Sequence, residues 1–302
     1  MRGKRWPPHT QDAPWFDRPD ALEFIENGLH SRRYDEEQAA MLRQWVRTGY
    51  VTLAGLIDDR DIDEMLADQD ALWAATEPIE WLVIDGLRWE GADPSPLPHS
   101  RLVQMSAEER ARLRAQHTWR SHAFYHFSKP ARRVFENAAL REACSLIFGR
   151  PAIPSFSINF TFGSDQHLHE DSVVFHIQPA NYLIGCWIAC EDIHPDSGPL
   201  VYYPGSHRAP LFSAFDNYPQ TNLRTCDKRT AELYERHVDE RAAAFERHRF
   251  MARKGEALLW HGMLLHGGDS IRDPERTRRS FVIHYMPEGA NKEKEIEGPF
   301  NW

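Results

Sequence analysis

Short strand-like runs, each stopped by a turn signal, fill the second half of the chain and constrain its fold most. Residues 155–162 alternate aromatic or aliphatic side chains with polar ones, the period-two pattern of a half-buried strand. Similar runs lie at 181–190, 200–203, 255–265 and 278–285, with proline- and glycine-containing turns at 195–198 and 204–207. This succession predicts a mainly β protein, an antiparallel sandwich or barrel with flanking helices.

A candidate metal site begins at His169-Glu170-Asp171. Side chains at i and i+2 of an extended segment point the same way, so His169 and Asp171 can bind one cation while Glu170 faces elsewhere. A third ligand must then come from a distant segment, and we expect it to be His266, which ends an apolar run and precedes two glycines. Two imidazoles and one carboxylate suit iron and leave coordination positions open. His167 shares the face of His169 and is the alternative ligand.

The last strand-like run carries a candidate anion-binding side chain. Alternation places Arg278, Ser280, Val282 and His284 on one face and Arg279 on the other. A guanidinium suits bidentate recognition of a carboxylate. The alternative is a solvated charge in a stretch rich in arginine. His207, His261 and His284 are expected to be structural hydrogen-bonding residues.

The ordered motifs resemble those of the phytanoyl-CoA dioxygenase family of Fe(II)/2-oxoglutarate oxygenases over about residues 34–287. They are the H-E-D tripeptide at 169–171, C-W-I-A-C-E-D at 186–192, S-G-P-L at 197–200, P-G-S-H-R at 204–208, G-E-A at 255–257, His266-Gly267 and R-x-S at 278–280. The resemblance implies a double-stranded β-helix, or jelly-roll, core. It also implies iron ligands at His169, Asp171 and His266.

The same resemblance implies 2-oxoglutarate and O2 as co-substrates. Arg278 and Ser280 would bind the distal carboxylate of 2-oxoglutarate, with Trp187 and Asn159 beside it. Related halogenases have alanine or glycine in place of the carboxylate ligand, so Asp171 favours hydroxylation or a related oxidation. Phe160, Phe162, Phe175 and Trp187 would form an apolar shell around the site.

Composition is compatible with one elaborated domain over 1–302, since β-barrel architectures commonly exceed 200 residues. We expect an N-terminal extension wrapping the surface at 1–33, a mostly helical support region at 34–149 with a loop at 94–98, and the jelly roll at 150–290. Within the last part, the charged segment 208–250 predicts amphipathic helix, either a lid or a solvated helix packed on the sheet. Aromatic residues in the support region could line the pocket or belong to the core: Trp89, Trp119, Tyr125 and Phe127.

Charge and cysteine content limit the binding partners and the cellular compartment that we expect. A net charge of −9 disfavours nucleic acid and anionic membranes, and no apolar run is long enough to cross a bilayer. Four scattered cysteines without C-x-x-C spacing indicate a cytoplasmic protein with reduced thiols. The oligomeric state stays open. No basic cluster suited to coenzyme A is evident, so a small metabolite or natural product of secondary metabolism is the favoured substrate.

Three functions fit the residues. The first is an iron and 2-oxoglutarate oxygenase that oxidises a C–H bond. The second is a cupin-like metal-dependent hydrolase or isomerase that uses the same triad without 2-oxoglutarate, and the third is a catalytically silent metal-binding scaffold. Arg278 separates the first two, because a hydrolase needs no buried clamp for a carboxylate.

Overall fold

Two antiparallel sheets form the core of the computed structural model, which describes residues 13–89, 95–175, 177–178, 181–215, 223 and 225–292. The larger sheet has eight strands in the order β1 (Tyr50–Leu53), β10 (Ala257–His261), β7 (Ile184–Ala189), β12 (Ser280–Pro287), β5 (Ala152–Phe160), β4 (Arg120–His122), β2 (Val83–Leu87) and β3 (Ser95–Pro98). The smaller sheet has the order β11 (His266–Gly268), β8 (Leu200–Tyr202) and β9 (His248–Arg249). A third pair joins β13 (Asn291–Lys292) to β6 (Ile177–Gln178).

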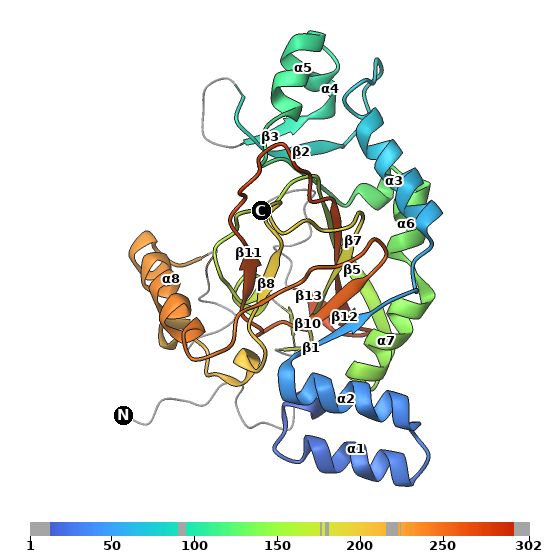
Figure 1. The fold of residues 1–302 in the computed structure, drawn as a ribbon, viewed down its shortest axis with the longest axis vertical. Coiled ribbons are helices and arrows are strands. Elements are labelled where there is room, and N and C mark those ends of the chain that lie inside the picture. Colours follow the sequence, from blue (N-terminus) through green and yellow to red (C-terminus); the bar gives the residue numbers. More distant parts are fainter. Residues whose placement is uncertain are drawn as a thin grey trace.

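Strand alternation divides the larger sheet into two differently covered faces. On β7, Ile184, Cys186 and Ile188 pack in a cluster with the helices, whereas Trp187 and Ala189 pack with residues of β8 in the smaller sheet. The cluster that contains Trp187 and Ala189 therefore lies between the two sheets. This arrangement is the expected double-stranded β-helix with flanking helices (Figure 1).

The helices gather mainly on the outer face of the larger sheet. They are α1 (Ala21–His30), α2 (Glu36–Thr48), α3 (Asp59–Ala71), α4 (His99–Leu102), α5 (Ala107–Arg114), α6 (Lys129–Phe135), α7 (Ala138–Phe148) and α8 (Lys228–Ala242). Short 3-10 turns are η1 (Trp15–Asp17), η2 (Phe124–His126), η3 (Asp171–Val173), η4 (Ser206–Arg208) and η5 (Ser213–Phe215). Figure 1 shows α8 apart from the other helices, on the side of β8 and β11. Nowhere in the described chain is a helix long and apolar enough to span a bilayer.

Helix ends follow local sequence signals. Asp35 begins α2 with a capping box in which its side chain accepts a hydrogen bond from the Gln38 N–H. Gly49 ends α2 in the left-handed region at φ 77° and turns the chain directly into β1. Asp227 begins α8 by accepting a hydrogen bond from the Thr230 N–H.

Two regional predictions were wrong. Residues 95–98, predicted as part of a loop, form β3, and their prolines are tolerated because this strand lies at the edge of the sheet. The described part of the predicted surface extension places Trp15 and Phe16 in the core and forms α1. The assignment of 1–302 to a single domain stays a prediction.

Candidate active site

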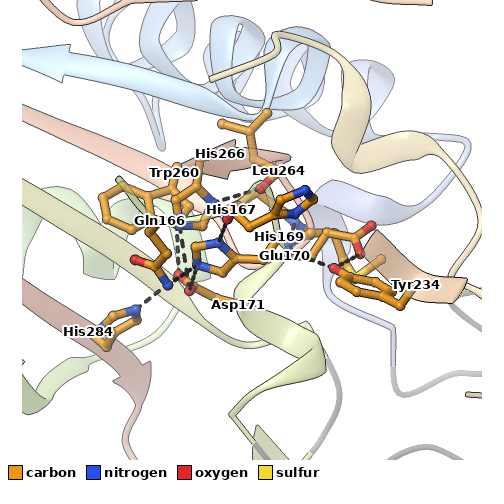
Figure 2. A network of polar contacts seen from close by, with 12 residues as sticks. Gln166, His167, His169, Glu170, Asp171, Tyr234, Trp260, Leu264, His266 and His284 are labelled. Carbon is orange, nitrogen blue, oxygen red and sulfur yellow. Dashed lines mark hydrogen bonds and ion pairs between the residues drawn. The ribbon is translucent and has the colours of Figure 1, made fainter. Parts of the chain in front are cut away.

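The three predicted ligands, His169, Asp171 and His266, lie close together in space. An antiparallel bridge pairs His169 with His266, with N···O distances of 3.0 and 3.1 Å between their backbones. Asp171 Oδ1 lies 3.7 Å from His169 Nε2 and 3.6 Å from His266 Nε2. One potential ligand atom from each residue lies within 4.8 Å of the others, and all three residues are buried (Figure 2). This spacing can hold one metal ion.

Both imidazoles present the nitrogen that a metal needs. His169 Nδ1 lies 2.8 Å from the His167 carbonyl oxygen, and His266 Nδ1 lies 2.9 Å from the Leu264 carbonyl oxygen. Each Nδ1 therefore carries the proton, which leaves the Nε2 lone pair facing Asp171. Burial lowers the pKa of His169 to about 4 and so favours the neutral ring that binds a metal.

The second oxygen of Asp171 is held by two side chains. Trp260 Nε1 donates to Asp171 Oδ2 at 2.8 Å, and His284 Nε2 lies 2.9 Å from the same oxygen. Burial alone would raise the pKa of Asp171, but the imidazoles of His266, His284 and His169 bring it below its ordinary value. Sequence reasoning missed this role of Trp260 and treated His284 only as a structural neighbour. The placement of His284 on the same strand face as Arg278 was the sequence signal that could have indicated its position in the site.

Arg278 lies buried on the inner face of the larger sheet, 2% exposed. Its guanidinium lies 5.5 Å from the Trp187 ring centroid and 5.6 Å from that of Phe160. Its hydrogen bonds reach only two carbonyl oxygens, each at 3.4 Å, and Nε has no partner. No carboxylate of the described residues is within ion-pair distance of it. Burial lowers its pKa to about 10, so it stays cationic at neutral pH.

Ser280 adds a second unpaired donor to this region. It follows Arg278 on the same face of the chain, is 1% exposed, and its hydroxyl has no hydrogen-bond partner. A buried cation without an acidic partner and a buried hydroxyl without a hydrogen-bond partner are costly unless an anionic ligand satisfies them. Arg278, which lines the pocket, therefore fits a carboxylate of a bound ligand, whereas Ser280 is not part of the pocket lining and its role stays a prediction.

A mostly apolar pocket of about 90 Å³ connects the triad to Arg278. Its lining comprises Ile158, Phe160, Ser164, Gln166, His169, Asp171, Val174, Phe175, Trp187, Leu200, Trp260, His266, Gly267, Arg278, Val282 and His284. Three members of the predicted apolar shell are present, and Phe162 is absent from the lining. Such a wall can exclude water from chemistry at the metal.

Asn159 was wrongly predicted to reach the co-substrate. Its neighbours Ile158 and Phe160 line the pocket, so alternation turns Asn159 to the opposite face of β5. There its Nδ2 lies 3.5 Å from the Met65 sulfur on α3. Nor do the four candidate aromatic residues of the support region line the pocket; Trp119, for example, packs against Trp73 in the core.

The remaining alternatives lie away from the triad. His167 points outward and has Nε2 3.4 Å from Asp239 Oδ2 on α8, so it does not compete as a ligand. Arg279 faces away from the pocket, as predicted, and donates to Asp70 at 3.0 Å. His207 packs against His261, with ring centroids 5.2 Å apart. That 208–250 moves as a lid stays a prediction.

The fold and the site define a jelly-roll protein with a buried centre of two histidines and one carboxylate. The family model described as phytanoyl-CoA dioxygenase (PhyH) matches residues 45–280, so the chain belongs to this family of Fe(II)/2-oxoglutarate oxygenases. Membership confirms the predicted resemblance and the cofactors iron and 2-oxoglutarate.

Similar proteins agree with this assignment. A phytanoyl-CoA dioxygenase domain-containing protein 1 homolog of Caenorhabditis elegans is 28% identical over 121 residues, which span 39% of each chain. The carbocyclase SnoK of nogalamycin biosynthesis, described as non-heme and alpha-ketoglutarate dependent, has a TM-score of 0.60 at 14% identity, covering 87% of both chains. EctD from S. alaskensis with 2-oxoglutarate and 5-hydroxyectoine has a TM-score of 0.58 at 16% identity, covering 97% of this chain and 83% of that one. These structural likenesses concern the fold.

Proposed function

We propose that this protein uses Fe(II) and 2-oxoglutarate to oxidise an unactivated C–H bond of a small metabolite or natural product, with release of succinate and CO2. Its placement in an oxygenase family sets the class of reaction. The observation that supports it most is the buried guanidinium of Arg278, which has no acidic partner among the described residues and shares a pocket with the triad.

Each part of the site has a task in this proposal. His169, Asp171 and His266 would hold the iron, which supplies the oxidising chemistry when O2 and 2-oxoglutarate are bound. Trp260 and His284 orient Asp171 so that Oδ1 faces the two imidazoles. Arg278 and Ser280 would bind the distal carboxylate of 2-oxoglutarate.

Two observations support hydroxylation of a small molecule. Asp171 supplies a carboxylate where related halogenases have none, and the pocket wall is mostly apolar, as hydrogen-atom abstraction requires. EctD binds 2-oxoglutarate and 5-hydroxyectoine, whereas SnoK is a carbocyclase, so the outcome of oxidation varies among proteins of this fold. The competing hydrolase or isomerase would leave the buried charge of Arg278 without a ligand.

Arg278→Ala tests the proposal against a matched neighbour, Arg279→Ala, whose side chain faces Asp70 instead of the pocket. Anaerobic Fe(II) and 2-oxoglutarate should give the wild type a weak visible charge-transfer band. We expect Arg278→Ala to raise the 2-oxoglutarate concentration at half-maximal absorbance by roughly 100-fold, the loss of about 3 kcal/mol for a charge-assisted pair. Arg279→Ala should leave it within about threefold of the wild type.

Activity provides the second arm of the test. A metabolite screen should find compounds that increase succinate release under iron and ascorbate, and Asp171→Ala should abolish that release. Equal 2-oxoglutarate dependence in the two arginine variants would remove Arg278 from its assigned role. The absence of any band with the wild type would favour the hydrolase or isomerase.

A further inference from the structure

The middle residue of the metal-binding tripeptide is tied to α8. Glu170 is fully buried, although it carries a carboxylate and stands between two proposed ligands. The Tyr234 hydroxyl donates to Glu170 Oε2 at 2.8 Å, and Arg241 Nη2 lies 2.6 Å from Oε1. Figure 2 shows Glu170 directed toward Tyr234 and away from the histidines.

The same helix also holds the backbone of the tripeptide. The Glu170 N–H donates to the Tyr234 hydroxyl at 3.0 Å, so one phenol both accepts from the main chain and donates to the side chain. Arg241 is fixed in turn by the carbonyl oxygens of Pro210 and Ser206, each at 3.3 Å. Since the neighbouring ligands share this backbone, any shift at Glu170 moves both His169 and Asp171.

Apolar packing joins α8 to both ligand segments. Tyr234, Val238 and Ala242 recur at helical spacing and form its buried face. They belong to one cluster with Val173, two residues after Asp171, and Leu265, one residue before His266. The helix therefore supports the local and the distant ligand together.

We propose that Arg241 and Tyr234 are positioning residues for the metal centre, which keep the Glu170 carboxylate out of the coordination sphere. This inference rests on the proposed iron site. Carboxylates are ligands that divalent cations bind, and Glu170 stands between two of the proposed ligands. Arg241 neutralises its charge, and Tyr234 satisfies its other oxygen on the side opposite the metal.

The consequence of removing Arg241 follows from burial. An uncompensated carboxylate in a dry site is costly, so the segment must relax. The segment can admit water beside α8 or turn the Glu170 side chain toward the cation, and each change disturbs His169 and Asp171. Removing both charges avoids this conflict, because a neutral amide can still bond to Tyr234.

A metal titration of the full-length apoprotein tests the inference, with Co(II) as the probe and its visible absorbance as the readout. We expect Arg241→Met to weaken Co(II) binding at least about tenfold, the loss typical of residues that orient metal ligands. The double variant Glu170→Gln/Arg241→Met should return to within about threefold of Glu170→Gln alone. Arg236→Met is the matched control, since this exposed arginine of α8 makes one hydrogen bond among the described residues, from its Nε to the Glu232 carbonyl oxygen at 3.4 Å.

If the ion pair has only a structural role, Arg241→Met should lower thermal stability and leave Co(II) affinity unchanged. Wild-type affinity in folded Arg241→Met, or no recovery in the double variant, would therefore overturn the inference. Should Arg241→Met not fold, Tyr234→Phe replaces it, and unchanged Co(II) binding there has the same meaning. The proposed iron site fails separately, if the wild type binds no Co(II) or if His266→Ala binds it equally well.

Discussion

At the scale of single residues, the two carboxylate oxygens of Asp171 have different neighbours, and this difference determines what the site can bind. Oδ1 faces the two imidazoles, while Oδ2 accepts from Trp260 and meets His284. A carboxylate fixed in this way can offer one oxygen to a metal without rotating. The indole N–H is thus part of the binding geometry, although tryptophan is no ligand.

Trp260→Phe isolates this contribution, because it removes the N–H and retains an aromatic ring. We expect metal affinity to fall by about 10- to 100-fold, measured by titration of the apoprotein with Co(II). Trp119→Phe is the control, since this buried indole donates to the Arg114 carbonyl oxygen, far from the triad in the sequence and outside the pocket lining. Equal losses in the two variants would mean that both act through general stability.

The sequence predicted ligand types at single positions better than it predicted their partners. His169 and Asp171 follow from alternation in an extended segment, and His266 follows from the need for a distant ligand. The prediction for Asn159 failed because the pocket-facing side of β5 carries the apolar Ile158 and Phe160 while the polar Asn159 is buried on the other side, so composition does not reveal which parity faces the pocket. The pairing of Trp260 and His284 with Asp171 depends on strand register, which a single sequence does not encode locally.

At the scale of elements, register explains why two large side chains converge on Asp171. Gly185 on β7 lies opposite Trp260 of β10 on one side and His284 of β12 on the other. A Cβ at Gly185 would lie 2.1 Å from the Trp260 ring. The glycine therefore makes the space in which the indole lies flat over β7 and reaches the carboxylate.

Gly185→Ala should consequently displace the indole and disturb the site from within the sheet. We expect a loss of about 1–3 kcal/mol in the free energy of unfolding from overpacking, together with weaker Co(II) binding. The destabilisation should be smaller in a Trp260→Phe background, because the atoms that meet the new methyl group are missing there. Urea denaturation of the four proteins in this cycle measures the coupling, and strict additivity would contradict it.

Elements were predictable where patterns were long and regular. The strand-like run at 278–285 carries clear alternation, and β12 forms close to these bounds. Strands β2, β3 and β4 were missed because each is short and β3 holds two prolines. β4 pairs with β5, β2 with β4 and β3 with β2, and this pairing supplies the stability that their own sequences lack.

At the scale of the whole molecule, the start of the described chain is joined to the far end of the jelly roll by buried polar groups. Asp17 Oδ1 lies 3.1 Å from His261 Nε2 at the end of β10, and Asn181 donates to its other oxygen at 3.1 Å. His207 packs on His261, so residues from four distant segments share one cluster. Because this cluster contains titratable side chains, the free energy of unfolding should depend on pH.

The pKa of His207 sets the direction in which stability should change with pH. Burial lowers its pKa from 6.5 to about 3. Above pH 6.5 the residue is neutral in both folded and unfolded chains, whereas between pH 6.5 and 3 only the unfolded chain takes up the proton. Stability is therefore lost as pH falls through that window, by up to about 1.4 kcal/mol per pH unit for this one group.

Urea denaturation between pH 7.5 and about 5 measures this slope, and His207→Gln should make it shallower whatever its effect at neutral pH. His194→Gln is the control, because the side chain of His194 is 40% exposed and lies outside this cluster. His169, whose pKa burial lowers to about 4, contributes with the same sign and should keep some slope in the His207 variant. An unchanged slope after His207→Gln would show that the histidine already accepts a proton within the folded cluster, with Asp17 as its counter-charge.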